Sequence, residues 1–322
     1  MTTLAELEAA ADLVHAHFPP TPQYVWPLLA RRTGAEVWVK HENHTPIGAF
    51  KVRGGLVYMD HLKRSGAGVA GVITATRGNH GQSIARAAAA VGLPSTILVP
   101  HGNSTEKNAA MRAFGAELIE FGRDFDEAKD EAHRLAGVRN LHFVPSFDPL
   151  LVRGVATYAL EFFRAVPDLY AVYVPIGMGS GICGLITARN LLGLETEIIG
   201  VVARNAPCIA LSFEAGRPIP TNAAQTFADG MACRVPSQDA LDIMLKGAAR
   251  IVQVSETEIA EAIRVYYEDT HNLAEGAGAA SLAALLQESS RQRGRRIGLV
   301  LSGGNIDRSA FAQVLAGETP AA

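Results

Sequence analysis

A lysine within a glycine-rich, apolar stretch is the first residue of this chain that suggests chemistry. Lys51 stands in GAFKVRGG, between Phe50 and Val52. A lysine whose amine enters a cleft loses hydration, which lowers its pKa and makes it nucleophilic. These residues alone leave one alternative, a lysine at a helix start whose stem packs on apolar surface while its amine reaches water.

A glycine-rich loop follows an apolar run in VYVPIGMGSGICGLITARNLL. The loop residues after the run are Gly177, Met178, Gly179, Ser180 and Gly181. A strand, a glycine loop and a helix start together present N–H groups to an anion, and phosphate is the usual occupant. A Walker loop is excluded because no Lys-Ser or Lys-Thr follows the glycines.

The same loop also matches a dinucleotide fingerprint, since Gly179, Gly181 and Gly184 spell GxGxxG. That interpretation requires an acidic residue at the end of the next strand, about 20 residues further on. The next predicted strand ends at Val202 and Ala203 instead. The pattern therefore favours a phosphate monoester over a nicotinamide dinucleotide, and a tight turn without a ligand remains the alternative.

Two further strand ends carry polar groups. In VITATRGNHGQS, the residues at the predicted helix start are Thr76, Arg77, Gly78, Asn79 and His80. Their N–H groups suit a carboxylate, although Asn79 alone is equally typical of a simple helix cap. In RIGLVLSGGNIDRSA, Ser302 and Asn305 follow an apolar run, and taken alone this segment is no more than a loop.

Composition favours a globular protein with small-molecule partners. The 322 residues are 48% hydrophobic and 19% charged, which suffices for a large core and more than one domain. A formal net charge of −3 without blocks of like charge gives no attraction to nucleic acid or to anionic membrane. No apolar run has the length of a membrane span and no signal-peptide pattern is present, so we expect a cytoplasmic location.

The three cysteines match no known ligand spacing. Cys183, Cys208 and Cys233 stand far apart and form neither a CxxC pair nor a zinc pattern. We therefore expect buried thiols in a reducing compartment.

Short β-branched runs alternate with longer helical patterns, which predicts parallel sheets covered by helices. Strands are predicted over residues 37–40, 71–75, 95–99, 117–121, 141–144, 171–174, 197–202, 251–254 and 297–301. Helices are predicted over residues 79–91, 105–114, 125–135, 150–165, 256–267 and 278–288. This number of strands with crossover helices fits two open sheets better than one barrel, and the tail GETPAA is predicted to be disordered.

Together, a nucleophilic lysine, a phosphate loop, a carboxylate loop and a polar strand end match the needs of pyridoxal phosphate. The chain resembles the second fold type of pyridoxal-phosphate enzymes, and within it the threonine and serine dehydratases of the ammonia-lyase branch. The likeness rests on GAFKVRGG, TRGNHGQS, PIGMGSGICG, TFADGMA, EGAGAASL and LSGGNID, which occur in family order between Thr21 and Asp307. It implies an α/β fold of two open, mostly parallel sheets with helices on both faces, as in the tryptophan synthase β chain. Residues 1–52 and 147–322 would form the large cofactor domain, and residues 53–146 a small mobile domain.

The resemblance also implies a role for each candidate residue. Lys51 would form the Schiff base with the cofactor beside Phe50 and would remove the substrate α proton. Residues 177–181 would hold the phosphate, although relatives often carry four successive glycines where this chain has two other residues. Asn79 would bond the ring hydroxyl, Ser302 would face the pyridine nitrogen, and Glu275 would lie near the ring. Residues 76–80 would hold the substrate carboxylate.

Ser302 bears on the type of reaction that the resemblance implies. A neutral hydroxyl does not protonate the pyridine nitrogen as an aspartate would, so loss of a β leaving group is favoured over transamination. We predict β-elimination of water from a threonine- or serine-type amino acid, giving a 2-oxo acid and ammonia. Hydroxyaspartate, phenylserine and intermediates of compatible-solute breakdown carry the same reacting atoms, so the substrate stays open. A non-catalytic cofactor-binding protein is the rival, disfavoured because both Lys51 and the carboxylate loop are kept.

Departures from the family pattern restrict the assignment. Arg77 occupies the place of a serine that serine racemases use, which disfavours racemization. Val202 and Cys208 replace acidic ligands with which those relatives bind a divalent cation, so we expect no metal. The regulatory region of biosynthetic threonine dehydratases is not expected, because the chain stops soon after LSGGNID, and a homodimer or higher homo-oligomer is expected.

Arg77 itself admits three interpretations. It turns outward to solvent or to a partner acid, it strengthens the hold on the substrate α carboxylate, or it reaches a second anionic group of a hydroxyaspartate-like substrate.

Overall fold

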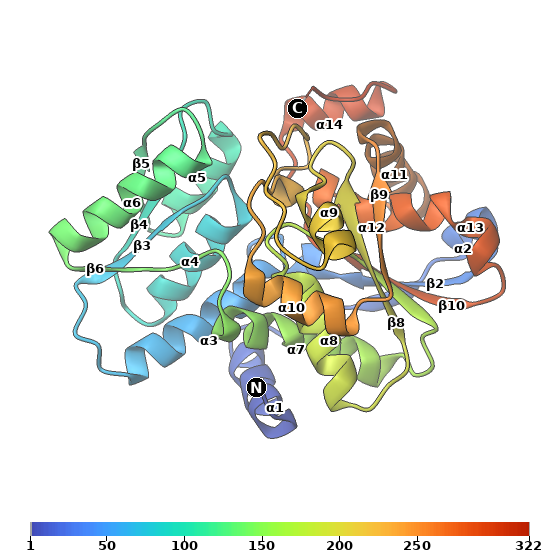
Figure 1. The fold of residues 1–322 in the computed structure, drawn as a ribbon, viewed down its shortest axis with the longest axis horizontal. Coiled ribbons are helices and arrows are strands. Elements are labelled where there is room, and N and C mark those ends of the chain that lie inside the picture. The colour runs from blue at the N-terminus through green and yellow to red at the C-terminus, as the bar shows by residue number, and fades with distance from the viewer. Residues whose placement is uncertain (1, 322) are drawn as a thin grey trace.

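Two β-sheets form the centres of the two halves of the molecule (Figure 1). The computed structural model describes residues 2–321. A six-stranded sheet has the order β1-β2-β10-β7-β8-β9 and is parallel except for β1, whereas a four-stranded sheet of order β5-β4-β3-β6 is parallel throughout. The strands are β1 Gln23–Val25, β2 Glu36–His41, β3 Gly71–Ala75, β4 Ser95–Val99, β5 Glu117–Glu120, β6 Leu141–Phe143, β7 Ala171–Pro175, β8 Glu197–Ala203, β9 Arg250–Val254 and β10 Arg296–Leu301.

Helices connect the strands and cover the sheets. The α-helices are α1 Leu4–His15, α2 Pro27–Thr33, α3 Lys51–Arg64, α4 Asn79–Ala90, α5 Thr105–Ala113, α6 Phe125–Arg139, α7 Pro149–Ala165, α8 Ser180–Leu191, α9 Cys208–Ala215, α10 Gln238–Gly247, α11 Glu256–Thr270, α12 Gly276–Gln287, α13 Ser289–Gln292 and α14 Arg308–Leu315. Two short 3₁₀ turns, η1 Glu42–His44 and η2 Asp229–Met231, lie in the loops. Several starts follow from local capping: the Ser255 side chain accepts from the Glu258 N–H, and Glu258 bonds back to Ser255.

Each sheet is buried on both faces, as strand composition predicts for parallel sheets. In β7, Tyr173 faces a core built with α11 and α12, while Val172 and Val174 face a second core built with α7 and α8. The four-stranded sheet packs α3, α4 and α5 on one face and α6 on the other. The predicted fold class of two open, mostly parallel sheets with helices on both faces is confirmed.

The functional segments all follow carboxyl ends of parallel strands, where open α/β sheets bind ligands. β2 leads through η1 to Lys51 at the start of α3, β7 leads into the glycine loop, and β10 ends before Ser302. β3, in the other sheet, ends before Thr76. An isolated bridge between Ala49 and Gly303 ties the lysine segment to the β10 loop.

The predicted disorder of the C-terminal tail is wrong for residues 317–321. The Glu318 N–H donates to the Gln313 carbonyl, and Pro320 is buried. Pro320 and Ala321 line a groove together with Ile306 and Ala310, so the tail lies against the start of α14. Ala322 lies outside the described residues.

Candidate active site

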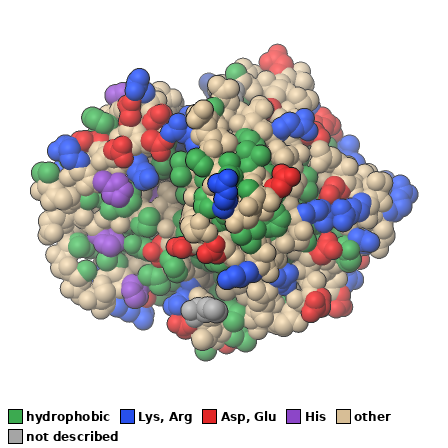
Figure 2. All heavy atoms as spheres, viewed as in Figure 1, with side chains coloured by type: hydrophobic (Ala, Val, Ile, Leu, Met, Phe, Trp, Pro, Cys, Tyr) green, Lys and Arg blue, Asp and Glu red, His purple; other side chains and the backbone are tan. Residues whose placement is uncertain are grey.

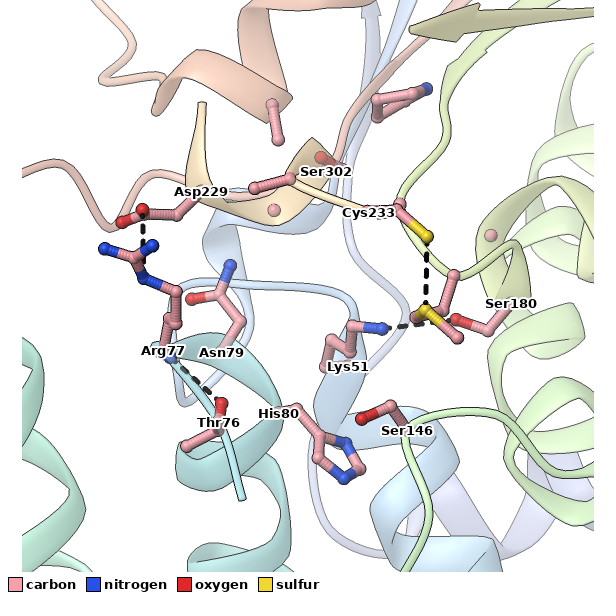
Figure 3. A pocket seen from close by; sticks show the side chains of 18 of the residues that line it. Lys51, Thr76, Arg77, Asn79, His80, Ser146, Ser180, Asp229, Cys233 and Ser302 are labelled. Atoms are coloured by element: carbon pink, nitrogen blue, oxygen red, sulfur yellow. Dashed lines mark hydrogen bonds and ion pairs between the residues drawn. The ribbon is translucent and has the colours of Figure 1, made fainter. Parts of the chain in front are cut away.

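A cavity of about 160 Å³ lies between the two sheets and receives side chains from both (Figure 3). All fourteen candidate residues from the sequence line it: Phe50, Lys51, Thr76, Arg77, Gly78, Asn79, His80, Gly177, Met178, Gly179, Ser180, Gly181, Glu275 and Ser302. Five further lining residues were not proposed for this site from the sequence: Lys107, Phe125, Ser146, Asp229 and Cys233. Segments that are up to 251 positions apart in the sequence, from Lys51 to Ser302, therefore meet in one place.

The Lys51 amine is buried and points across the cavity toward Ser180 (Figure 3). Its Nζ lies 3.4 Å from Ser180 Oγ and 5.2 Å from the centre of the Phe50 ring. Burial lowers the pKa of Lys51 to about 8, and the negative charge of Glu275 opposes this shift only in part. A substantial fraction of neutral, nucleophilic amine is therefore present near neutral pH.

The lowered pKa of Lys51 can be measured directly. In the ligand-free protein, trace acetylation of Lys51 should increase with pH and level off above about pH 8, because only the neutral amine reacts. Peptide mass spectrometry at each pH would follow the reaction, with a small amine of known pKa added as internal standard. A midpoint near 10.5, the ordinary lysine value, would show that the amine is hydrated.

Alanine does not fit at Gly177 in the glycine loop after β7. A Cβ on Gly177 would lie 2.1 Å from the Gly230 carbonyl oxygen, and Gly179 has a φ of +102°. Those constraints keep the loop backbone close to η2 and leave the first N–H groups of α8 at the cavity, because first-turn N–H groups have no partner within their helix. Met178 and Ser180 do not interrupt this arrangement, since the N–H donors belong to the backbone.

The loop after β3 is held by its own side chains. The Thr76 hydroxyl accepts from the Gly78 and Gly81 N–H groups, at 3.0 and 3.2 Å. His80 directs its ring away from the loop to Thr74 Oγ1, at 3.1 Å, and burial lowers the pKa of His80 to about 3. His80 is therefore a neutral structural side chain, and the N–H groups of the first turn of α4 are what this loop offers to a carboxylate.

Asn79 is fixed in position by two other predicted polar residues. Its Nδ2 donates to Glu275 Oε1 at 2.6 Å, and its Oδ1 accepts from Asn305 Nδ2 at 2.8 Å. Ser302 lies beside this group, 2% exposed, and its carbonyl accepts from the Phe50 N–H. Because the amide of Asn79 has a defined orientation, its second N–H is available to a ligand in the cavity.

Glu275 titrates near neutrality. Burial raises the pKa of Glu275 to about 7, against the opposing effects of Lys107 and the Asn79 amide. Between pH 4.5 and 7, Glu275 is therefore protonated in the folded protein and ionised in the unfolded chain, whose pKa is 4.5. Stability contributed by the protonated carboxyl is complete below pH 4.5 and is lost as pH rises through 7.

Replacing Glu275 by glutamine should remove this pH dependence. In the ligand-free wild type, roughly 3 kcal/mol of the free energy of unfolding should disappear between pH 4.5 and 7, whereas Glu275→Gln should lack this component. Urea unfolding at several pH values would measure the difference. The exposed Glu195→Gln is the matched control, and a Glu275→Gln protein with the wild-type pH profile would refute the raised pKa.

A charged cluster at the rim of the cavity joins the two halves of the protein. Arg77 Nε lies 3.7 Å from Asp229 Oδ1, and Lys107 Nζ lies 2.7 Å from Asp229 Oδ2. The side chains of Arg77, Asp229 and Lys107 are 49%, 33% and 10% exposed. In the ligand-free protein Arg77 therefore turns to a partner acid, the first of its three interpretations, and its guanidinium points away from Lys51 (Figure 3).

Lys107 is the more deeply placed cation of this cluster. Although burial opposes it, the carboxylates of Asp229 and Glu275 raise the pKa of Lys107, so it stays charged. A Cβ on Gly78 would lie 2.9 Å from Lys107 Cδ, which places the lysine stem directly against the loop after β3. The glycine at position 78 is therefore needed for this contact.

A fully buried ion network lies beneath the start of α3. Arg53, two residues after Lys51, donates to Glu42 Oε2 at 2.7 Å and to Glu161 Oε1 at 2.6 Å. Lys40 donates to Glu161 Oε2 at 2.6 Å. Burial alone would raise the pKa of Glu161, but Arg53 and Lys40 outweigh it and lower that pKa to about 2. The network fixes the helix turn that carries Lys51 to β2 and α7.

Comparison with known proteins agrees with this site. Residues 14–303 match the family described as pyridoxal-phosphate dependent enzyme. An L-threonine ammonia-lyase of Geobacter sulfurreducens is 37% identical over 305 residues, 94% of this chain and 73% of the relative, and that of Thermotoga maritima is 34% identical over 98% of this chain and 78% of the relative. The structure of the processed form of threonine deaminase isoform 2 from Solanum lycopersicum aligns with a TM-score of 0.88 and 29% identity, covering 98% of this chain and 94% of that one.

The chain therefore belongs to the family of pyridoxal-phosphate dependent enzymes, and pyridoxal phosphate is its cofactor. The residues at the cavity fit that group: Lys51 has an amine with a lowered pKa, Gly177 stands where a Cβ has no space, and α8 begins at the cavity with N–H groups for an anion. Among residues 2–321, no helix is long and apolar enough to cross a membrane.

Proposed function

We propose that the protein is an ammonia-lyase that removes water from a β-hydroxy amino acid of the threonine or serine type. Loss of the β hydroxyl and the α proton gives an enamine, and its hydrolysis yields a 2-oxo acid and ammonia. The observation that carries the proposal is the position of the Lys51 amine, buried between the helix starts of α8 and α4. Relatives named threonine ammonia-lyase support the substrate class.

The proposal assigns a role to the lysine, the two loops and Asn79. Lys51 binds the cofactor covalently and afterwards accepts the substrate α proton on its neutral amine. The N–H groups of residues 177–181, with the Ser180 hydroxyl, hold the cofactor phosphate. The N–H groups at the start of α4 hold the substrate α carboxylate, and Asn79, oriented by Glu275, bonds the ring hydroxyl.

The cofactor supplies an electron sink for the α carbon when it is bound. Ser302 would limit that sink, because a hydroxyl beside the ring nitrogen would not give it a proton as an aspartate would. A weaker sink of this kind would favour departure of the β hydroxyl. Elimination is favoured over transamination for this reason.

Substrate choice can be tested with a panel of β-hydroxy amino acids. Threonine, serine, hydroxyaspartate and phenylserine would be assayed for release of 2-oxo acid by the purified, cofactor-loaded protein. We expect threonine or serine to give the highest kcat/KM. If none of the four released a 2-oxo acid, the proposal would be overturned in favour of a non-catalytic cofactor-binding protein. If only hydroxyaspartate or phenylserine did so, the reaction would stand and the substrate alone would be corrected.

Replacement of Arg77 by alanine should have a small and uniform effect. Its half-exposed ion pair with Asp229 is worth at most about 1 kcal/mol, so kcat/KM should fall less than about fivefold with both threonine and serine. A uniform loss above about tenfold would instead show that Arg77 holds the α carboxylate. A loss confined to hydroxyaspartate would show that it recognises a second acidic group.

We propose further that the two sheets belong to two domains, residues 1–52 with 147–322 and residues 53–146. The first boundary falls within the first turn of α3, so this helix is shared between them. Movement of the smaller domain would close the loop after β3 over the substrate and exclude water.

A homodimer or higher homo-oligomer and a cytoplasmic location are part of the same proposal. Leu211, Val235 and Leu245, on or between α9 and α10, are exposed, and hydrophobic side chains gather near the middle of the face in Figure 2. Elsewhere on this face, charges of both signs are interspersed (Figure 2). Light scattering of the purified protein would give the number of subunits.

A further inference from the structure

Three sulfur atoms meet beside the phosphate loop, although their residues are far apart in the sequence. Cys233 Sγ lies 3.4 Å from Met178 Sδ, a contact drawn as a dashed line between two sulfur atoms in Figure 3. Cys208, the first residue of α9, donates its thiol to the Cys233 carbonyl at 3.0 Å. Folding thus converts two cysteines without a sequence pattern into an adjacent pair.

The two thiols differ in access to the cavity. Cys233 lines the cavity together with Met178 and is 5% exposed. Cys208 is fully buried behind Cys233. The proximity of Cys208 lowers the pKa of Cys233, whereas the proximity of Cys233 and burial raise the pKa of Cys208. Cys233 is accordingly the thiol that attacks, and Cys208 is placed to resolve the product.

We propose that Cys233 and Cys208 form a peroxide-oxidisable thiol pair that controls retention of the cofactor. The Cys233 sulfur attacks a hydroperoxide, the O–O bond breaks, and with hydrogen peroxide one water leaves as Cys233 becomes a sulfenic acid. The Cys208 sulfur then attacks the Cys233 sulfur, an S–S bond forms, and the second water leaves. Two thiols lose two electrons in total, and one peroxide is reduced to two waters.

The link to the cofactor follows from the segment that carries Cys233. Gly230, three residues earlier, places its carbonyl directly over Gly177, where a Cβ would lie 2.1 Å from it. Cys233 itself rests on Met178 in the same loop. A bond to Cys208 turns the Cys233 side chain from Met178 toward α9, so the packing that holds residues 177–181 in shape is lost. We expect the Kd of the cofactor to rise at least tenfold after oxidation.

The test uses the cofactor-loaded protein and hydrogen peroxide. After treatment, free thiols are blocked with iodoacetamide, and the bond is sought by mass spectrometry without reduction. Because Pro218 follows Arg217, trypsin leaves both cysteines on one peptide, so cleavage after Glu214 is needed to show a bond between separate peptides. We expect Cys208 joined to Cys233, cofactor in the ultrafiltrate, and recovery of both on addition of dithiothreitol and cofactor.

Matched variants separate this proposal from general oxidative damage. In Cys208→Ser no bond forms, dimedone traps the sulfenic acid on Cys233, and the cofactor is retained. Cys183→Ala should behave as the wild type does, because burial raises the pKa of the Cys183 thiol to about 12 and it lies away from the pair. The proposal is overturned if peroxide leaves both thiols reduced, if Cys233 is oxidised without bonding to Cys208, or if the bond forms and the cofactor stays. The wild-type measurement decides these outcomes even where a variant folds poorly.

Discussion

Replacement of Lys51 by alanine should abolish elimination while leaving the fold intact. In the proposed mechanism, the variant loses both the amine that would bind the cofactor and the base that would accept the α proton. General bases alone contribute about 10²- to 10⁴-fold, so kcat/KM should fall by more than about 1000-fold. The Lys51 amine contacts the Ser180 hydroxyl, at 3.4 Å, and forms no ion pair that the substitution would break. The far-ultraviolet circular dichroism spectrum and the Tm should therefore change little.

A chemical label provides the second readout for Lys51. Borohydride should bleach the cofactor absorbance of the wild type and fix the cofactor to the peptide that contains Lys51. Lys63→Ala, an exposed position on the same helix, is the matched control and should retain full activity and labelling. A label on Lys40 or Lys63 would show that the site has been assigned to the wrong lysine.

Replacement of Arg53 by alanine should be the most destabilising single change in the protein. The variant leaves the carboxylates of Glu42 and Glu161 buried without their main partner. Removing one member of a buried ion pair costs about 3 to 5 kcal/mol, because a desolvated charge is left uncompensated. Urea unfolding should show this loss as a lower midpoint with an unchanged slope.

Two controls accompany Arg53→Ala. Arg123 forms an exposed pair with Glu127, so Arg123→Ala should leave the unfolding midpoint within experimental scatter. The other control is the effect of acid on the wild type. Because folding lowers the pKa of Glu161, the ionised Glu161 contributes its full share to the free energy of unfolding above pH 4.5, and this share is lost as pH falls toward 2. An Arg53→Ala midpoint equal to that of the wild type would show that water compensates the network.

Most strand and helix positions were predictable because buried parallel strands read as continuous apolar runs. Residues 71–75 and 95–99 agree with β3 and β4 to the residue. Among the strands, β1 alone was not predicted, since three residues at an edge show no periodicity that distinguishes them from a loop. Its antiparallel pairing with β2 depends on the partner strand rather than on its own sequence.

The candidate site was predictable where glycine and polar residues follow a strand, as at residues 177–181. Lys107 and Asp229 were missed because each lies in a segment with an ordinary local pattern, a helix and a polar loop. Their importance arises only when the two sheets are placed together. One feature of the sequence could have indicated Lys107: it falls on the same face of the predicted helix over residues 105–114 as Met111, and the structure buries this face.

Helix α3 packs closely against α7 on one side and against α4 on the other. A Cβ on Gly54 would lie 2.8 Å from the Leu151 carbonyl oxygen in α7, and one on Gly55 would lie 2.4 Å from Ser83 Oγ in α4. If the two halves of the protein move relative to each other, this helix is the natural axis of rotation. Displacement grows with distance from an axis, so Lys51, the first residue of α3, would move less than Arg77 and Lys107 at the rim of the cavity. Lys51 would therefore keep its position while the two halves move, whereas the rim of the cavity would open and close.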